Sequence, residues 1–419
     1  MCGIAGFAGS GNQDTLARMV AAVRHRGPDD QGFFLDNQVG LGFARLSIID
    51  LSPTGHQPMT SADGNATIIF NGEIYNYREL KSELLQKNSY PFRGTSDTEV
   101  LLALYQIYGI DFLKKINGMF ALALYDKRNG SLFLTRDRMG KKPLYYTVIG
   151  GTLIFGSEPK ALLQHPACVR KLNLTALNDY LHYEYVPTPY SIFEGISKLE
   201  PAHSALWQQG KLTTHPFWSM DFTEKRIAEA DALKKLDAEL QRSVAQRLVA
   251  DVPLGIFLSG GLDSSTIAYY AQKASTQKIK TYSIGFKESS FDESAFARMV
   301  AEHLGTDHHE QILSAKDSLE LIPHIADLLD EPMADPSIIP TYLLSKFTRE
   351  HVTVALGGDG GDELFAGYPT FQAFKLAHWY RKLPETLRRL LLEPALSLIP
   401  ASERDMSLGF LVRRFIAGT

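Results

Sequence analysis

Short apolar runs separated by turn residues fill the first 156 residues of the chain. Such runs, bounded by glycine, asparagine or proline, predict β-strands. One helix is predicted among them: Ser96 can cap it with Glu99 three residues on, and Gly109 ends it. The first half is therefore predicted to be rich in strands. The apolar runs are Gly40 to Leu46, Ala66 to Phe70, Met119 to Tyr125, Leu132 to Leu134 and Leu153 to Phe155.

The pattern changes after a stretch rich in proline and glycine, Val186 to Pro216, which favours an irregular connector between domains. Apolar residues then recur at steps of three and four, which predicts an amphipathic helix with one buried stripe. Beyond it, short apolar runs alternate with helical segments, the pattern of parallel strands joined by crossover helices. We expect a first domain at residues 2–205, a connector at 206–226 and a second domain at 227–419. The helical stripe is Leu233, Leu236, Leu240, Val244 and Leu248, and the strands are Leu254 to Leu258, Thr281 to Phe286 and Val352 to Leu356.

The composition is that of an ordinary folded protein: of 419 residues, 44% are hydrophobic and 21% are charged. The 43 basic and 47 acidic residues give a net charge of −4 without a basic block, so no nucleic acid partner is expected. No apolar run approaches the roughly 18 residues of a membrane-spanning helix, and the first residues do not resemble a signal peptide. The two cysteines, Cys2 and Cys168, cannot form a disulfide framework, which favours a reducing compartment such as the cytoplasm.

Cys2 directly follows the initiator methionine, so removal of Met1 would leave a thiol and a free α-amine on one residue. The amine, with a reference pKa of about 7.7 to 8.0, can accept the proton of the thiol, whose reference pKa is about 8.5. Attack of the thiolate on an amide forms an oxyanion that needs fixed donors, and Asn71 and Gly72 can supply them. The alternative is a small buried cysteine and an Asn-Gly hairpin turn; the position of Cys2 favours the catalytic interpretation.

Two charged residues are candidates for holding an amino-acid substrate. Arg45 lies in an apolar run and needs a partner, which the substrate carboxylate could provide. Asp97 could pair with the substrate ammonium, although an acid in the first turn of a helix is also favoured by the helix dipole alone. The charged segment from Arg24 to Asp29 is equally consistent with a polar loop, and we assign it no catalytic role.

The strand Leu254 to Leu258 leads directly into a glycine- and serine-rich turn, Ser259 to Ser265, and then into a helical run. A strand, a glycine-rich turn and a helix N-terminus together direct backbone N–H groups at an anion such as a phosphate. No lysine follows the glycines, so this is not a Walker A loop. Asp263 is placed to hold Mg²⁺ against pyrophosphate oxygens. The alternative is a glycine-rich turn used only for packing. It would account for the two glycines, but it accounts less well for the whole run of seven residues directly after a buried strand.

A second loop, Gly357 to Glu363, follows the strand Val352 to Leu356 and combines glycines with carboxylates. At the carboxyl end of a parallel strand it would face the first loop, and Asp362 could complete the Mg²⁺ site with Asp263. A calcium loop or an exposed turn is the alternative, but the spacing does not match an EF-hand.

Taken in order, these motifs resemble those of the glutamine-dependent asparagine synthetases over essentially the whole chain. The resemblance implies an α+β N-terminal-nucleophile (Ntn) hydrolase sandwich, the class II glutamine amidotransferase domain. It also implies an α/β parallel-sheet domain of the adenine nucleotide α-hydrolase type. The motifs are Cys2-Gly3-Ile4, Arg24 to Asp29, Arg45 to Asp50, Asn71 to Asn76, Ser96-Asp97, Ser259 to Ser265 and Gly357 to Glu363.

The resemblance also implies roles for residues. Cys2 would form a glutamyl thioester, ammonia would cross a tunnel, and aspartate activated by ATP as an acyl-adenylate would become asparagine, with AMP and pyrophosphate released. Catalysis would use Cys2, Asn71, Gly72 and Asp359, and Mg²⁺ would bind to Asp263 and Asp362. Glutamine would be held by Arg45, Leu46, Ser47, Ile48, Ile49, Asn71, Gly72, Glu73 and Asp97. ATP would be held by Phe257, Ser259, Gly260, Gly261, Leu262, Asp263, Ser264, Ser265, Ile284, Gly357 and Gly358.

Two departures from the family pattern leave alternatives open. The family has Glu where this chain has Asp359, and one methylene less can displace a catalytic carboxylate by about an ångström. The acceptor could therefore be another carboxylate, such as a sugar acid of a surface polysaccharide. Family members also continue beyond residue 419 and carry a late catalytic lysine there, so we expect this chain to be incomplete. Two further alternatives for the function are a β-lactam-forming relative and a non-catalytic relative that binds glutamine or nucleotide. A homodimer is a possible assembly.

Overall fold

The computed structural model describes residues 1–88, 90–224, 226–287, 292–397, 399 and 408–418, so the final residue, Thr419, lies outside the described part. The chain forms two compact units. Unit 1 consists of Met1–Lys235, Val249–Val252 and Ile322–Ile338, and unit 2 of Leu236–Leu248, Pro253–Leu321 and Ile339–Thr419. Two short segments from the second half of the sequence therefore belong to unit 1.

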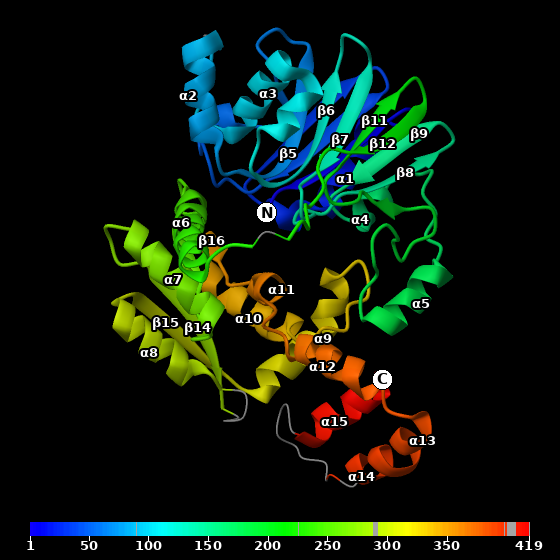
Figure 1. Ribbon diagram of the computed structural model, residues 1–419. Helices are drawn as coiled ribbons and strands as arrows, with labels where there is room; N and C mark the ends of the chain where they lie inside the picture. The colour runs from blue at the N-terminus through cyan, green and yellow to red at the C-terminus, as the bar shows by residue number, and fades with distance from the viewer. Residues whose placement is uncertain (89, 225, 288–291, 398, 400–407, 419) are drawn as a thin grey trace. The chain divides into compact units, whose positions relative to one another are not determined.

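Unit 1 contains two six-stranded sheets whose strand pairs are antiparallel (Figure 1). The first sheet has the order β10 (Ser197–Lys198), β8 (Tyr145–Ile149), β9 (Thr152–Gly156), β1 (Gly3–Ala8), β3 (Val39–Arg45) and β2 (Asp30–Asp36). The second has the order β12 (Lys211–Pro216), β11 (His203–Gln208), β7 (Ser131–Arg136), β6 (Gly118–Asp126), β5 (Ala66–Ile74) and β4 (Met59–Thr60). The strand-rich first half predicted from the apolar runs is confirmed.

Three apolar cores order unit 1 into four layers. One core lies between the two sheets and includes Ile4, Phe43 and Ile69. The other two join the outer face of each sheet to helices: α1 and α4 cover the first sheet, and α2 and α3 cover the second (Figure 1). The predicted α+β sandwich is therefore present. The helices of this unit are α1 (Gln13–Ala22), α2 (Tyr77–Asn88), α3 (Asp97–Tyr108), α4 (Pro159–Leu162) and α5 (Leu174–Tyr183), with 3-10 turns η1 (Arg24–Arg26), η2 (Pro53–Gly55) and η3 (Gly109–Lys114).

Helix α3 begins and ends where the sequence predicts. Ser96 is its N-cap, and Gly109 follows its last residue. Glu99, expected to close a capping box, instead accepts hydrogen bonds from the backbone N–H groups of Arg93 and Gly94, each at 2.9 Å.

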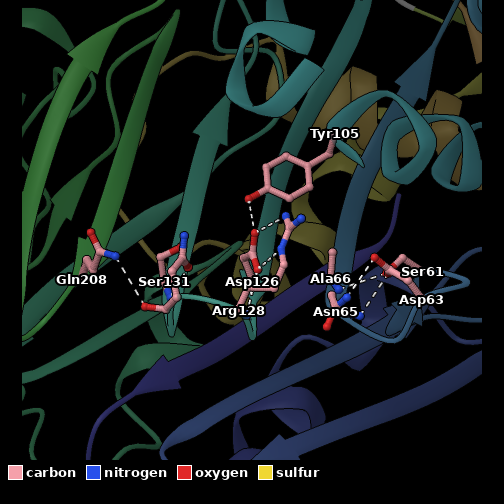
Figure 2. A network of polar contacts seen from close by, with 10 residues as sticks. Ser61, Asp63, Asn65, Ala66, Tyr105, Asp126, Arg128, Ser131 and Gln208 are labelled. Carbon is pink, nitrogen blue, oxygen red and sulfur yellow. Dashed lines mark hydrogen bonds and ion pairs between the residues drawn. The ribbon is translucent and has the colours of Figure 1, made fainter. Parts of the chain in front are cut away.

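A buried polar contact fixes the other half of α3. The Tyr105 hydroxyl donates to the Asp126 carboxylate at the end of β6 (2.8 Å), which also accepts from the Arg128 guanidinium (Figure 2). This contact anchors the helix to the second sheet, while its first turn presents Asp97.

The stretch from Val186 to Pro216, expected to be an irregular connector, is partly regular, so that prediction is wrong for its second half. Strands β11 and β12 form a hairpin that extends the second sheet. Ala205 and Trp207 alternate as buried residues of β11, and this period of two was hidden among the prolines. Gln209 and Gly210 at the turn have φ of 49° and 77°, the positive values that a tight hairpin requires.

Unit 2 is built on a parallel sheet with the order β15 (Asp307–Leu313), β14 (Lys280–Phe286), β13 (Leu254–Phe257) and β16 (Val354–Leu356), which confirms the predicted α/β architecture. The amphipathic helix is present as α6, but only its C-terminal part is packed: Val244 is buried in the core, whereas Leu233 is exposed. The helices of the second half are α6 (Glu229–Arg247), α7 (Leu262–Ala274), α8 (Ser294–Leu304), α9 (Ala315–Leu328), α10 (Ile338–Arg349), α11 (Gly361–Phe365), α12 (Pro369–Tyr380), α13 (Glu385–Leu387), α14 (Glu393–Ser397) and α15 (Leu408–Ala417), with the π-turn η4 (Arg388–Leu392).

Among the helices described, none is both long and apolar enough to cross a membrane. Cys2 and Cys168 are both free thiols.

Candidate active site

Cys2 lies immediately before β1, where the end of β3 runs beside it. Its Sγ lies 3.4 Å from the backbone nitrogen and 3.5 Å from the backbone oxygen of Leu46. Burial raises the pKa of the Cys2 thiol, while the Leu46 hydrogen bond, the N-terminal amine and Arg45 act in the opposite direction. The charge of Asp97 also acts on this thiol. The structure thus brings Cys2, Arg45 and Asp97, far apart in sequence, into one electrostatic environment.

Asn71 and Gly72 lie inside β5 rather than in a hairpin turn. Both pair with β6, Asn71 opposite Ala121 and Gly72 opposite Phe120, so the turn interpretation is excluded. The Asn71 side chain is 1% exposed, and neither of its amide atoms has a hydrogen-bond partner among the described residues. Burying an unpaired polar group costs about 1 to 3 kcal/mol, so such a side chain calls for a ligand.

Asp97 closes the site from the first turn of α3. Its carboxylate accepts a hydrogen bond from the backbone nitrogen of Ile74, at the end of β5 (3.0 Å). Burial raises the pKa of Asp97 to about 7, and the negative charge of Glu73 acts in the same direction. A substrate ammonium placed here would relieve both effects, because a nearby cation favours the carboxylate.

The loop Leu46 to Ile49, expected to hold glutamine, is fixed through its backbone. Ser47 donates its N–H to Asp29 (2.8 Å), and Ile48 accepts from the backbone nitrogen of Asp251 (2.9 Å). The Asp251 carboxylate in turn accepts from the backbone nitrogen of Asp50 (2.8 Å).

Arg45, at the end of β3, is buried and donates to the carbonyl oxygens of Asp50 and Ser52. Its guanidinium therefore shapes this same loop. Because Arg45 also acts on the Cys2 thiol, the loop and the nucleophile share one fixed cation.

Arg26, to which the sequence assigned no catalytic role, contacts the nucleophile directly. Its Nε donates to the carbonyl oxygen of Cys2 (3.0 Å), and its Nη1 pairs with Glu158 (2.7 Å). His25 and Lys160 also pair with Glu158, and Lys160 pairs with Asp330 (2.9 Å). The sequence offered only the charged motif Arg24 to Asp29, which carries no sign of these contacts. Cys2 is 24 residues from Arg26, and Glu158 is 132 residues away.

We expect Glu158→Gln to lower the free energy of unfolding near neutral pH by about 1 to 3 kcal/mol, because Arg26, His25 and Lys160 lose their shared carboxylate. Burial alone would raise the pKa of Glu158, but hydrogen bonds from His25 and Arg26 hold it at about 2. Since the folded pKa lies below the unfolded value of about 4.3, this stabilisation is present above that value and is lost as pH falls towards 2. Urea unfolding at pH 7 and pH 3 measures the difference; an equal effect at both values would contradict the assignment.

In unit 2, the loop Ser259 to Gly261 joins β13 to α7. The Ser259 and Ser264 hydroxyls bond each other (2.9 Å), and Ser264 also bonds the backbone of Ser259 and Gly261, so these two serines shape the loop. Gly260 has φ +82°, and a Cβ there would lie 2.5 Å from the carbonyl carbon of Phe296. The Ser265 hydroxyl is buried without a partner among the described residues and is available to a ligand. The Leu262 side chain is exposed, so this residue can offer only its backbone to phosphate.

The second loop adjoins the first because β16 and β13 are paired neighbours. A Cβ on Gly358 would lie 2.8 Å from the backbone nitrogen of Ser264, and one on Gly361 would lie 2.3 Å from an Asp263 carboxylate oxygen. The two predicted ATP-binding loops are thus in contact at the carboxyl ends of two neighbouring parallel strands. Bulkier residues at these glycines would separate the loops.

The residues expected around the adenylate lie in or directly after these neighbouring parallel strands. Phe257 ends β13, and Ile284 lies in the adjacent strand β14. Gly357 approaches Phe257, since a Cβ on this glycine would lie 3.8 Å from the ring. Asp359 is exposed and its carboxylate lies near Gly357.

Asp263 and Asp362 offer two hard carboxylates, but the described residues contain no group of three or more side chains that could hold a metal. The Asp362 carboxylate lies against Gly367, where a Cβ would be 2.0 Å away. Mg²⁺ commonly binds through one or two carboxylates together with substrate phosphates and water. Two carboxylates are therefore a donor set that fits a magnesium ion arriving with ATP.

Two family profiles match the chain: that of the glutamine amidotransferase domain over residues 1–218 and that of asparagine synthase over residues 235–415. A solved Bacillus subtilis glutamine phosphoribosylpyrophosphate amidotransferase covers 74% of this chain and 81% of its own, with 15% identity and a TM-score of 0.41.

Curated relatives match nearly the whole chain. Asparagine synthetase [glutamine-hydrolyzing] 1 of Bacillus subtilis is 38% identical over 97% of this chain and 65% of its own length. A putative asparagine synthetase [glutamine-hydrolyzing] 2 of Methanocaldococcus jannaschii is 39% identical over 93% of this chain and 79% of its own. The chain thus spans about two thirds of the length of the first relative and about four fifths of the length of the second. Because both profiles match in order and these relatives match nearly the whole chain, the chain belongs to the family of glutamine-hydrolysing asparagine synthetases.

Proposed function

We propose that this protein is a glutamine-dependent asparagine synthetase, with glutamine hydrolysis in the first half of the chain and adenylation in the second. The observation that carries the first reaction is Asn71, whose buried amide has no hydrogen-bond partner among the described residues. Its strand β5 ends at Ile74, which donates to Asp97, and the charge of Asp97 acts on the Cys2 thiol. Family membership and the paired phosphate loops support the second reaction. The glutaminase domain would comprise the expected residues 2–205 together with the rest of the hairpin β11–β12, and the adenylating domain would lie within residues 227–419.

In the first reaction, the Cys2 thiolate attacks the side-chain carbonyl carbon of glutamine. The resulting oxyanion accepts hydrogen bonds from the Asn71 amide and the Gly72 N–H, which matter most when charge develops. The nitrogen takes up the proton that the α-amine received from the thiol and leaves as ammonia. Water then hydrolyses the thioester to glutamate. Arg45 and the loop Leu46 to Ile49 would hold the substrate, with Asp97 and Glu73 on its ammonium.

In the second reaction, the aspartate side-chain carboxylate attacks the α-phosphorus of ATP, and pyrophosphate leaves. Ser265 and the N–H groups of the loop Ser259 to Gly261 would hold the pyrophosphate, while Phe257 and Gly357 would contact the AMP part. Mg²⁺, held by Asp263 and Asp362, would neutralise phosphate charge. Ammonia displaces AMP from the acyl-adenylate and gives asparagine. Ammonia must stay sheltered on its way, because ammonium is not nucleophilic.

ATP–pyrophosphate exchange across a panel of carboxylates, combined with a glutaminase assay on the same preparation, tests this function. Aspartate should elicit exchange, and glutamine should yield glutamate with Met1 absent from the mature protein. A second candidate acceptor, a sugar acid, is favoured by one observation: Asp359 stands where the family pattern has Glu. Exchange with a sugar acid and none with aspartate would replace the first acceptor with the second, and no glutamate from glutamine would refute the glutaminase.

We expect Asn71→Leu to lower the kcat of glutamine hydrolysis by about 10² to 10³, the usual effect of losing one oxyanion donor. Stability should stay unchanged or rise slightly, because the amide of Asn71 has no partner to lose among the residues that the structure describes. Steady-state kinetics and urea unfolding together check both parts. A marked loss of stability with normal kcat would show that Asn71 has a structural role.

The proposed partners are small molecules, namely glutamine, ATP and aspartate or another carboxylate. A homodimer and a cytoplasmic location complete the proposal, the latter supported by two cysteines that are both free thiols.

A further inference from the structure

One buried lysine lies beside the nucleophile and has no part in the reaction described above. Lys142 follows β7 in the segment that leads to β8, and only 5% of its surface is exposed. Its neighbour Lys141 is exposed to solvent, as most lysines are. A lysine is rarely buried without a reason, since its ammonium loses hydration.

The backbone of Lys142 is held on both sides. Its N–H donates to the Asp137 carboxylate (3.0 Å), and its carbonyl oxygen accepts from the Arg136 guanidinium (2.8 Å). Asp137 also accepts from the backbone of Phe120, which lies opposite Gly72 in the second sheet. Lys142 is therefore linked through Asp137 to β6, the strand that pairs with β5, which carries the proposed oxyanion donors.

The ammonium of Lys142 reaches the N-terminus of the chain. Its Nζ lies 2.8 Å from the Met1 sulfur, a weak hydrogen-bond acceptor, across 141 residues of sequence. Removal of Met1 would delete this acceptor, and Cys2, the next residue, would then become the N-terminus towards which the ammonium reaches. The charge of the Cys2 thiolate acts on Lys142 and favours its ammonium form.

We propose that Lys142 is a positioning residue for the N-terminal nucleophile: its buried ammonium is a fixed cation that favours the thiolate and the neutral amine of Cys2. A cation within a few ångströms stabilises a thiolate and destabilises a protonated amine, so both effects promote attack at neutral pH. This role rests on the proposed glutaminase reaction.

The charges around Lys142 agree with a cation at working pH. Burial lowers the pKa of Lys142 to about 8, Arg26 acts in the same direction, and Glu73, the Cys2 thiolate and Asp137 act in the opposite one. On the Cys2 side, Arg45 supports the thiolate and Asp97 opposes it. Because the folded pKa is depressed, the ammonium is present at pH 7 and disappears as pH rises through about 8.

The test compares Lys142→Met, Lys142→Arg and, as a matched control, Lys141→Met, each with Met1 shown to be absent by intact mass. The measurement is the rate of alkylation of Cys2 by iodoacetamide from pH 5 to 9, quantified on the Cys2 peptide. Cys168 provides an internal reference in every sample, since burial raises the pKa of its thiol to about 11. Alkylation needs no substrate, so the result does not depend on glutamine hydrolysis.

In Lys142→Met, the pH at which Cys2 becomes reactive should rise by about one unit, and the rate at pH 7 should fall about tenfold. The acid limb of kcat/KM for glutamine should move with it. Lys142→Arg keeps the cation and should behave like the wild type, as should Lys141→Met. Methionine has nearly the same length and no charge to bury, so it should be accommodated at this buried position.

An alkylation profile of Lys142→Met that matches the wild type overturns the proposal. So does Lys142→Arg behaving like Lys142→Met, because the role would then depend on shape and not on charge. If the wild type hydrolyses no glutamine but Lys142→Met shows the expected shift, the proposed function is refuted, while the effect of Lys142 on the reactivity of the Cys2 thiol still holds.

Discussion

Replacing Cys2 with alanine should reduce glutamine hydrolysis by at least about 10³-fold, because no other described group supplies both a thiol and its own base in this environment. Alanine fits the space of the cysteine, which packs against the core between the two sheets, so folding should be preserved. Synthesis driven by added ammonia should continue, because the residues proposed for adenylation lie in the other unit. Glutamate release and ammonia-dependent formation of AMP, measured on the same sample, check both statements.

Cys168→Ala is the matched control for this experiment. Cys168 is the other free thiol and packs against a different core, beside α1 and α4. Its replacement should leave both activities unchanged. If Cys2→Ala also abolished the ammonia-dependent reaction in a folded protein, the two reactions would not be separable, and the division of chemistry between the halves would be wrong.

The second large effect is expected at the phosphate loop. Asp263→Asn should abolish ATP–pyrophosphate exchange, because it removes a carboxylate proposed to hold Mg²⁺ at the contact between the two loops. Glutamine hydrolysis should remain, since Cys2 and its surroundings lie in unit 1. Asparagine has nearly the same volume as aspartate, so the approach of Gly361 to this side chain should be preserved.

A matched control removes the same charge elsewhere in unit 2. Glu302→Gln, at an exposed position of α8, should leave exchange unchanged. Titration with Mg²⁺ adds a second measurement: a residual activity in Asp263→Asn that recovers at high Mg²⁺ supports the role in metal binding. Full exchange in Asp263→Asn at ordinary Mg²⁺ would remove this residue from the site.

Much of the fold followed from local patterns. The apolar runs located β3, β5, β6, β7 and β9, and Ser96 and Gly109 located the ends of α3. These signals are readable because the period of burial and the capping chemistry act over a few residues. The strands β11 and β12 were missed, because prolines and glycines conceal a hairpin whose partner strand is about 70 residues away.

By itself, the sequence determined the chemistry on offer: a cysteine at position two, a glycine- and serine-rich turn after a buried strand, and a second acidic loop after another. Each is a contiguous segment whose backbone needs and reactivity are local. The tertiary structure decided the environment of these groups. It put Asn71 in a strand with its amide unpaired among the described residues, turned Arg26 onto the carbonyl of Cys2 and brought Lys142 to Met1. These contacts join residues separated by up to 141 positions, and no local pattern carries their pairing, because sheet packing alone sets which distant side chains meet.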